Sequence, residues 1–116
     1  MFEKEIHSGR LDSGMTFNQK VWALTTRIPR GKVATYGDLA RALGTSAYRA
    51  VGNAMNKNPY APKVPCHRVV GSDGSLTGYA GGLEKKRRML TREGVMVRND
   101  RVDLKDRFAF KSAVRI

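Results

Sequence analysis

Residues 35–56 read TYGDLARALGTSAYRAVGNAMN, and this stretch decides the fold. Thr35 followed three positions later by Asp38 predicts a capping box at the start of a helix. Gly44 then opens a short turn, after which Ser46 can cap a second helix. The two predicted helices share an apolar face, formed by Leu39, Ala40, Leu43, Ala47, Ala50, Val51, Ala54 and Met55. A helix, a short glycine-containing turn and a second helix predict a helix-turn-helix over about 35–56.

Upstream of this stretch, the sequence predicts one further helix. Thr16 and Gln19 fit another capping box, and apolar residues then recur at helical spacing until Pro29 and Gly31 end the helix. We expect residues 1–15 to be a flexible polar lead-in and residues 16–116 to form the domain.

Downstream of the helix-turn-helix, the sequence predicts two loops, one more helix and a hairpin. Two prolines make residues 58–62 a rigid loop, and the glycine-rich run 71–82 lets the backbone approach a ligand closely. A basic helix is predicted over Leu83–Glu93, and valines on both sides of Asn99-Asp100 predict a hairpin. The expected fold is α/β and mostly α, a single compact winged helix-turn-helix-like domain with a short hairpin and an active-site loop.

The charge of the chain points to a polyanionic partner. Its 22 Lys and Arg residues against 10 Asp and Glu residues give a net charge of +12 over 116 residues. The excess is divided equally between residues 1–83 and 84–116, so it belongs to the whole domain. So large an excess more often marks a nucleic acid partner than a merely solvated surface. No apolar run approaches the roughly 20 residues needed to span a bilayer.

The composition also bears on metals and on the compartment. Two histidines and one cysteine make a structural zinc site improbable, and we expect no metal. A single cysteine fits a reducing intracellular compartment, cytoplasmic or nuclear, and residues 1–14 are too polar for a secretory signal peptide.

The one cysteine lies in the sequence Val64-Pro-Cys-His-Arg-Val-Val70. Most lone cysteines are small core residues, but His67 follows Cys66 directly. A thiol reacts as its thiolate, and an adjacent base is a usual way to obtain thiolate at neutral pH. Glu93, at the end of the basic helix, is the best candidate for an acid that orients the imidazole, although spacing alone also fits a solvated helix end.

At these residues the chain resembles the O6-alkylguanine-DNA alkyltransferases, also called methylated-DNA–protein-cysteine methyltransferases. The resemblance covers about residues 16–94 and rests on several motifs in the family's order. These motifs are Thr35-Tyr36-Gly37, Arg49-Ala-Val-Gly52, Asn58-Pro59, Pro65-Cys66-His67-Arg68-Val69, Tyr79-Ala-Gly-Gly82 and Arg92-Glu93-Gly94. Only fifteen residues precede Thr16, where the family usually has a further, non-catalytic domain.

The resemblance implies a role for each matching residue. Cys66 would accept the alkyl group irreversibly, His67 would be a water-mediated base, and Glu93 would orient His67. Asn58 would brace the segment that leads to the active site. Tyr36 would press on the DNA backbone and donate a hydrogen bond to guanine N3.

DNA recognition is implied in the same way. The target nucleotide must leave the stack, because the alkyl group cannot be reached inside a duplex. Arg49 would fill the gap that remains. Small residues would let the second helix of the pair lie in the narrow minor groove, namely Ala47, Ala50 and Gly52. The base pocket would be lined by Met55, Val69, Tyr79, Ala80 and Gly81. From the residues alone, a solvated face that could also contact phosphate is expected for the basic run Lys85, Lys86, Arg87 and Arg88.

Two residues depart from the family's pattern. Ala80 stands where many members have serine, and Tyr48 is bulkier than the small residue often found before the arginine.

Two other interpretations of the function stay open beside repair. Alkyltransferase-like proteins sense damaged DNA without transferring the alkyl group; they share this length and a similar segment at 101–105, but lack the cysteine. The second alternative is a plain helix-turn-helix regulator with a structural cysteine. This interpretation leaves the Pro-Cys-His-Arg segment unexplained. The repair interpretation implies a monomer, no cofactor, no membrane, and double-stranded DNA containing O6-alkylguanine as partner.

Overall fold

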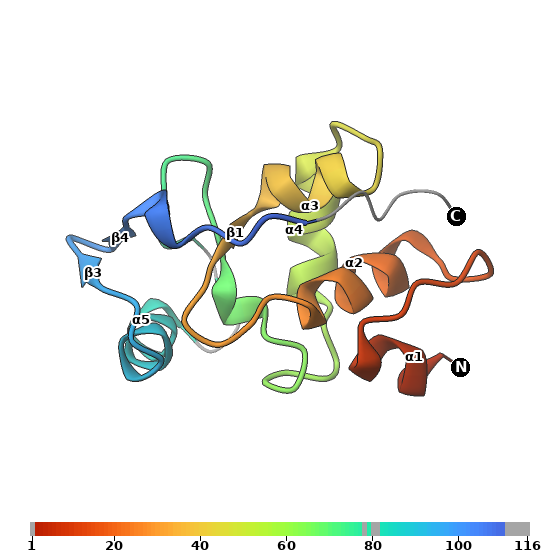
Figure 1. The fold of residues 1–116 in the computed structure, drawn as a ribbon, viewed down its shortest axis with the longest axis horizontal. Coiled ribbons are helices and arrows are strands. Elements are labelled where there is room, and N and C mark those ends of the chain that lie inside the picture. Colours follow the sequence, from red (N-terminus) through yellow and green to blue (C-terminus); the bar gives the residue numbers. More distant parts are fainter. Residues whose placement is uncertain (1, 78, 80–81, 111–116) are drawn as a thin grey trace.

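The computed structural model of the chain describes residues 2–77, 79 and 82–110. It has the predicted architecture, a mostly helical α/β domain with very short strands (Figure 1). Its elements are α1 (Glu3–Ser8), α2 (Phe17–Thr26), β1 (Ala34–Thr35), α3 (Tyr36–Ala42), α4 (Tyr48–Asn56), the 3₁₀ turn η1 (Cys66–Arg68), β2 (Val69–Val70), α5 (Leu83–Arg92), β3 (Val97–Arg98), β4 (Arg101–Val102) and the 3₁₀ turn η2 (Leu104–Asp106).

Both predicted capping boxes are present. In α3 the Asp38 backbone N–H donates to the Thr35 hydroxyl at 3.0 Å, and the Thr35 N–H donates to the Asp38 carboxylate at 3.0 Å. Thr16 and Gln19 form the equivalent pair at the start of α2. The cap predicted for the second helix of the pair was wrong. α4 begins after Ala47 with no side-chain cap, and Thr45 instead accepts the Ala47 N–H at 3.1 Å.

A small parallel sheet joins the helix-turn-helix to the cysteine segment. β1 pairs with β2 in the register Ala34 to Val69, and α3 begins directly after β1. The C-terminal segment lies on β1 as well, because Val33 forms a parallel bridge with Arg107. The Arg107 guanidinium also donates to the Asp38 carboxylate at 2.8 Å. The residues that cap α3 are therefore held by segments from both halves of the chain.

The N-terminal residues are not the flexible lead-in that the sequence predicted. α1 lies against α2 (Figure 1), and Ile6 is fully buried together with Met15, Ala23 and Val64. The half-buried Trp22 on α2 lies beside this cluster and donates its indole N–H to the Ala54 carbonyl of α4 at 2.8 Å. Within residues 2–15, Phe2, Ile6, Leu11 and Met15 thus belong to a packed cluster.

The hairpin predicted around Asn99-Asp100 is confirmed. Val97 pairs with Val102, and both turn residues have positive φ, 54° and 56°, as a type I′ turn requires. The hairpin and α5 lie at the opposite end of the molecule from α1 (Figure 1). The cysteine segment lies between these ends.

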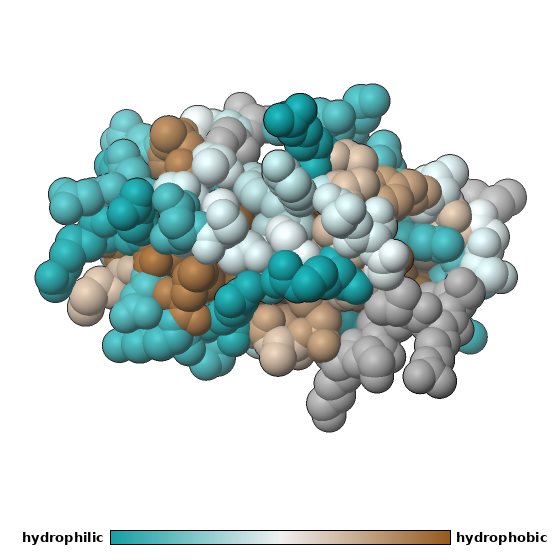
Figure 2. Space-filling view, turned by 90° about the horizontal axis from the view of Figure 1, so that it is seen from above, coloured by the Kyte–Doolittle hydropathy of each residue, from teal (hydrophilic) through white to brown (hydrophobic). Residues whose placement is uncertain are grey.

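The surface on the side of α3 and α4 is mainly hydrophilic or intermediate in hydropathy, with apolar residues in small separate patches (Figure 2). In the described part of the chain, every helix is too short or too polar to cross a bilayer.

Candidate active site

Cys66 occupies the first position of η1, where the chain turns into β2. Its side chain belongs to the main core, and the residue is 8% exposed. The Cys66 N–H donates to the Val64 carbonyl at 2.8 Å, and the Asn58 side-chain amide donates to the same carbonyl at 3.0 Å. Asn58 also accepts the Tyr60 backbone N–H at 2.9 Å. Asn58 therefore fixes the loop on the N-terminal side of the cysteine.

His67, Arg68 and Glu93 form a buried hydrogen-bonded cluster. His67 Nε2 lies 2.9 Å from Glu93 Oε2, and the two side chains are 2% and 8% exposed. Arg68 donates to both carboxylate oxygens of Glu93, from Nε at 2.9 Å and from Nη2 at 2.8 Å. Its remaining nitrogen, Nη1, donates to the Ile28 carbonyl at 2.7 Å. The arginine thereby ties the end of α5 to the end of α2.

This cluster determines which nitrogen of His67 is basic. Burial raises the pKa of Glu93, but hydrogen bonds from Arg68 and His67 outweigh this effect and hold that pKa below its ordinary value. An ionised carboxylate can only accept hydrogen bonds, so His67 Nε2 carries the proton. Burial lowers the pKa of His67 despite the nearby Glu93, so the ring is neutral at neutral pH. Its Nδ1 is buried, has no hydrogen-bond partner among the described residues, and holds the lone pair of a base.

Three polar side chains lie near the cysteine segment: Tyr36 and Tyr79 pack against the core cluster that contains Cys66, and Lys86 donates to Val69. Burial raises the pKa of Tyr36 and of Tyr79 and lowers the pKa of Lys86 to about 8. In all three cases a smaller contribution comes from electrostatic interaction with Cys66. Residues from α3, the glycine-rich loop and α5 therefore lie around the cysteine segment.

Lys86 is placed differently from the sequence-based expectation. It was grouped with a solvated basic face, but it is fully buried. Its ammonium donates to the Val69 carbonyl at 2.7 Å and to the Thr77 carbonyl at 2.9 Å. The side chain faces the core because α5 is amphipathic, and its stem covers apolar surface while its nitrogen reaches two carbonyls.

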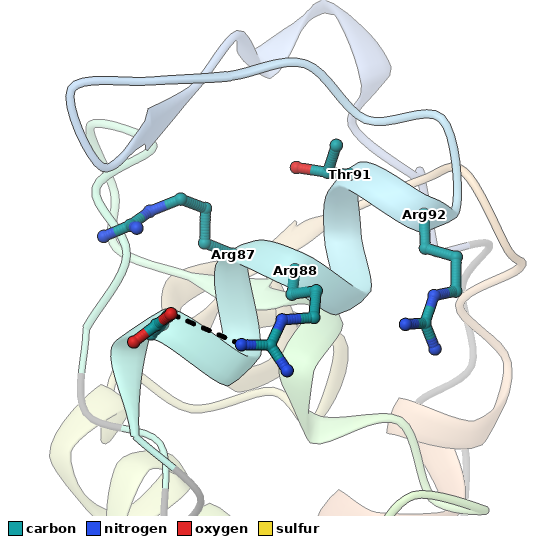
Figure 3. Close-up of a pocket in the computed structure, with 5 residues that line it drawn as sticks. Arg87, Arg88, Thr91 and Arg92 are labelled. Atoms are coloured by element: carbon teal, nitrogen blue, oxygen red, sulfur yellow. Dashed lines mark hydrogen bonds and ion pairs between the residues drawn. The ribbon is translucent and has the colours of Figure 1, made fainter.

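The outward face of α5 does carry the expected exposed charge. Arg87, Arg88 and Arg92 project from it (Figure 3). Arg88 pairs with Glu84 at 3.3 Å, and Arg87 pairs with Asp100 of the hairpin turn at 2.7 Å. Exposed pairs of this kind contribute little to stability.

Of the expected base-pocket residues, the structure places three in the main core around Cys66. Met55 and Val69 are buried, and Tyr79 packs against them. The Val69 carbonyl, expected to recognise the base, accepts a hydrogen bond from the Lys86 ammonium at 2.7 Å. Ala80 and Gly81 lie outside the described residues.

The residues expected to enter the minor groove and the base stack lie on α4 and at its start. Ala47, Tyr48 and Arg49 are exposed, and Tyr48 is 57% exposed. A Cβ added to Gly52 would meet no atom within 4 Å, so packing inside the protein does not require glycine there. An approach by an external surface would explain it.

Sequence reasoning missed three residues of the site: Arg68, Thr77 and Lys86. Arg68 stands inside the cysteine motif but was given no role. Lys86 lies in a run of four basic residues, and only its spacing of four residues from the buried Leu90 could have marked its position as inward-facing. The hydroxyl of Thr77 lies 3.0 Å from that of Tyr36, a contact between residues 41 positions apart that no local pattern announces. The described residues include no His, Cys, Asp and Glu cluster suited to a metal ion.

Comparisons with known proteins agree with this geometry. The family model described as 6-O-methylguanine DNA methyltransferase, DNA binding domain, matches residues 16–95. The chain is similar to a methylated-DNA–protein-cysteine methyltransferase of Methanosarcina barkeri, with 47% identity over 95 residues, 74% of this chain and 60% of the relative. A Salmonella typhimurium protein of the same name is 48% identical over 85 residues, 72% of this chain and 50% of the relative. The chain thus spans about half the length of the curated relatives it matches.

Solved structures show the same likeness. The O6-methylguanine-DNA methyltransferase of Pyrococcus kodakaraensis is 52% identical with a TM-score of 0.64, over 71% of this chain and 48% of that one. Mycobacterium tuberculosis OGT in complex with DNA is 42% identical with a TM-score of 0.66, over 78% and 62%.

One further neighbour is matched over nearly its whole length. Schizosaccharomyces pombe Atl1, in complex with damaged DNA containing O6-carboxymethylguanine, is 32% identical with a TM-score of 0.71, over 82% of this chain and 94% of that one. The buried Cys66 beside a His67–Glu93 pair, the helix-turn-helix and the match over residues 16–95 lead to one conclusion: this chain belongs to the family of 6-O-methylguanine DNA methyltransferase DNA-binding domains.

Proposed function

We propose that the chain repairs DNA by transferring the alkyl group of O6-alkylguanine to Cys66 in a single, irreversible turnover. The observation that carries the proposal is the hydrogen bond of 2.9 Å between His67 Nε2 and Glu93, next to a nearly buried thiol. This hydrogen bond leaves Nδ1 as the basic atom of the neighbouring imidazole. A thiol with a base oriented by an acid is the arrangement of a covalent nucleophile.

The chemistry follows from these residues. His67 Nδ1 takes the thiol proton through a water molecule, and the Cys66 sulfur attacks the alkyl carbon. A sulfur–carbon bond forms, the bond from that carbon to guanine O6 breaks, and its electron pair passes to the guanine ring. The ring then takes up one proton from water and leaves as guanine, and His67 returns the thiol proton to water. The electron pair is stabilised by Tyr36, whose hydroxyl donates a hydrogen bond to N3.

The exposed face of α4 delivers the substrate. The small residues and the open surface at Gly52 support approach to a minor groove. Arg49, exposed beside them, fills the stack once the damaged nucleotide has turned out.

Intact mass tests the proposal. Incubation with a duplex that contains O6-methylguanine should add one CH₂ unit to the protein, the difference between a thiol and its methyl thioether. Cys66→Ala should bind the same duplex and gain nothing. A wild-type mass that stays unchanged while the duplex remains bound would reject alkyl transfer.

That result would instead select a second function, the sensing of damaged DNA without repair. The observation in its favour is the match to 94% of the Atl1 chain, a protein solved with damaged DNA. Under this alternative, binding to alkylated DNA would persist and Cys66→Ala would behave like the wild type in every assay.

A further inference from the structure

Thr77 connects the glycine-rich loop to the helix-turn-helix. Its side-chain hydroxyl donates to the Tyr36 hydroxyl at 3.0 Å, and both side chains are half-buried. On its backbone side, the Thr77 carbonyl accepts from the buried Lys86 ammonium at 2.9 Å. The same ammonium donates to Val69, three residues after Cys66. Thr77 is thus fixed at its backbone by α5 while its hydroxyl reaches the first residue of α3.

The direction of the hydroxyl contact decides what Tyr36 can do. A phenol has one O–H to donate and oxygen lone pairs to accept with. With Thr77 as the donor to the Tyr36 oxygen, the Tyr36 proton is left to donate elsewhere. Hydrogen bonds in a chain polarise one another, so the contact also makes the Tyr36 O–H a stronger donor. The hydrogen bond from Thr77 accordingly opposes the effect of burial on the pKa of Tyr36.

We infer that Thr77 is a positioning residue for alkyl transfer, which presents the Tyr36 O–H as the donor to N3 of the departing guanine. This inference rests on the proposed function and adds a residue to it. Thr77 acts only through Tyr36, and no proton leaves either hydroxyl. As the carbon–oxygen bond breaks, negative charge builds up on the guanine ring. The polarised Tyr36 O–H stabilises that charge more strongly in the transition state than in the bound substrate, so the contact accelerates the chemical step.

A double-mutant cycle tests the inference. Thr77→Val removes the hydroxyl at nearly constant shape, Thr77→Ser keeps it, and Tyr36→Phe removes the group through which Thr77 acts. Single-turnover rates are measured with free O6-alkylguanine and with an alkylated duplex. Thr77→Val should slow both reactions by about tenfold, the size expected for one hydrogen bond in the transition state. Thr77→Ser should stay near the wild-type rate, and duplex affinity should not change.

The decisive comparison is made in the Tyr36→Phe background. There, Thr77→Val should have no further effect, because the atom it polarises is gone. A merely structural threonine would slow the reaction by the same factor in both backgrounds, and that outcome overturns the inference while leaving alkyl transfer intact. Thr91→Val, on the exposed face of α5, is the matched control and should match the wild type. If Thr77→Val does not fold, Thr77→Ala takes its place in the cycle.

The failure of the proposed function is visible separately. A wild-type protein that gains no mass from alkylated guanine contradicts both proposals before the cycle begins. A wild type that gains mass, with additive effects of Thr77 and Tyr36, contradicts only the role of Thr77.

Discussion

Arg49 is exposed in the first turn of α4, and its proposed role is in nucleotide flipping and not in alkyl transfer. Its removal should therefore affect the first of these steps and not the second. We expect Arg49→Ala to leave the reaction with free O6-alkylguanine nearly unchanged, because a free base needs no extrusion. The reaction with duplex DNA should slow by about tenfold for every 1.4 kcal/mol of stabilisation lost from the flipped state. Single-turnover rates on both substrates provide the measurement. Equal slowing on both would show that Arg49 is structural.

Glu93 gives a prediction about pH. Because burial places the pKa of His67 below its ordinary value of 6.5, the transfer rate of the wild type should fall only below about pH 6.5, as Nδ1 becomes protonated. The Glu93 carboxylate raises the pKa of His67, so Glu93→Gln should move this acid limb to still lower pH. Its plateau rate should fall by roughly 10²-fold, within the range that a positioned base contributes.

The matched measurement is the pH dependence of the single-turnover rate with the free base, together with thermal unfolding to confirm that Glu93→Gln is folded. An acid limb that moves to higher pH in this variant would mean that Glu93 does not act on His67. Cys66→Ala supplies the blank at every pH.

At the scale of the element, α5 carries one residue whose titration is linked to folding. Lys86 has a pKa of about 8 in the folded chain and 10.5 as its ordinary value. Between these values the unfolded chain binds more protons, so the contribution of Lys86 to stability rises with pH. Relative to Lys86→Met, the wild-type free energy of unfolding should increase by about 2 kcal/mol from pH 7 to pH 10.

Urea denaturation of both proteins at each pH checks this prediction, because the other titrating groups cancel in the difference. Lys85→Met, on the exposed side of the same helix, is the control and should track the wild type. If the difference in free energy of unfolding between the wild type and Lys86→Met does not change with pH, burial does not lower the pKa of Lys86.

The elements themselves divide into those that local signals predict and those that they do not. The capping boxes of α2 and α3 and the turn at Asn99-Asp100 depend on residues within three positions of each other, and sequence reasoning found them. Helix α1 was not predicted, because Ile6 is the one apolar side chain within that helix. Ile6 is buried in a cluster with Val64, which is far along the chain.

The site shows the same limit. Cys66 and His67 are adjacent and could be singled out from sequence. Glu93 could be named only as a candidate at a helix end, and the resemblance then implied its role. The contact between His67 and Glu93 spans 26 positions, and those of Lys86 with Val69 and Thr77 span 17 and 9. Tertiary packing alone brings these groups together. At Lys86 hydropathy gives the wrong prediction, because a charged side chain is expected in solvent and this one is fully buried.

For the molecule as a whole, the charge of +12 predicts how the proposed DNA binding responds to salt. The logarithm of the duplex binding constant should fall linearly with the logarithm of salt concentration, with a slope of about −0.9 for each phosphate neutralised. Fluorescence anisotropy of a labelled duplex over a salt series gives this slope. The rate with free O6-alkylguanine, which contacts no phosphate, should stay nearly constant over the same series. If the duplex binding constant does not change with salt concentration, the basic surface is not the surface that binds DNA.

The indole of Trp22 has a practical consequence. It is the only tryptophan in the chain, and its N–H is bonded to Ala54 on α4 while its ring meets Tyr60 edge-on at 5.9 Å between centroids. Intrinsic fluorescence of the unlabelled protein therefore comes from the junction between α2 and the helix-turn-helix. A red shift of that emission marks the separation of these helices and can be followed in the same cuvette as the loss of the free thiol.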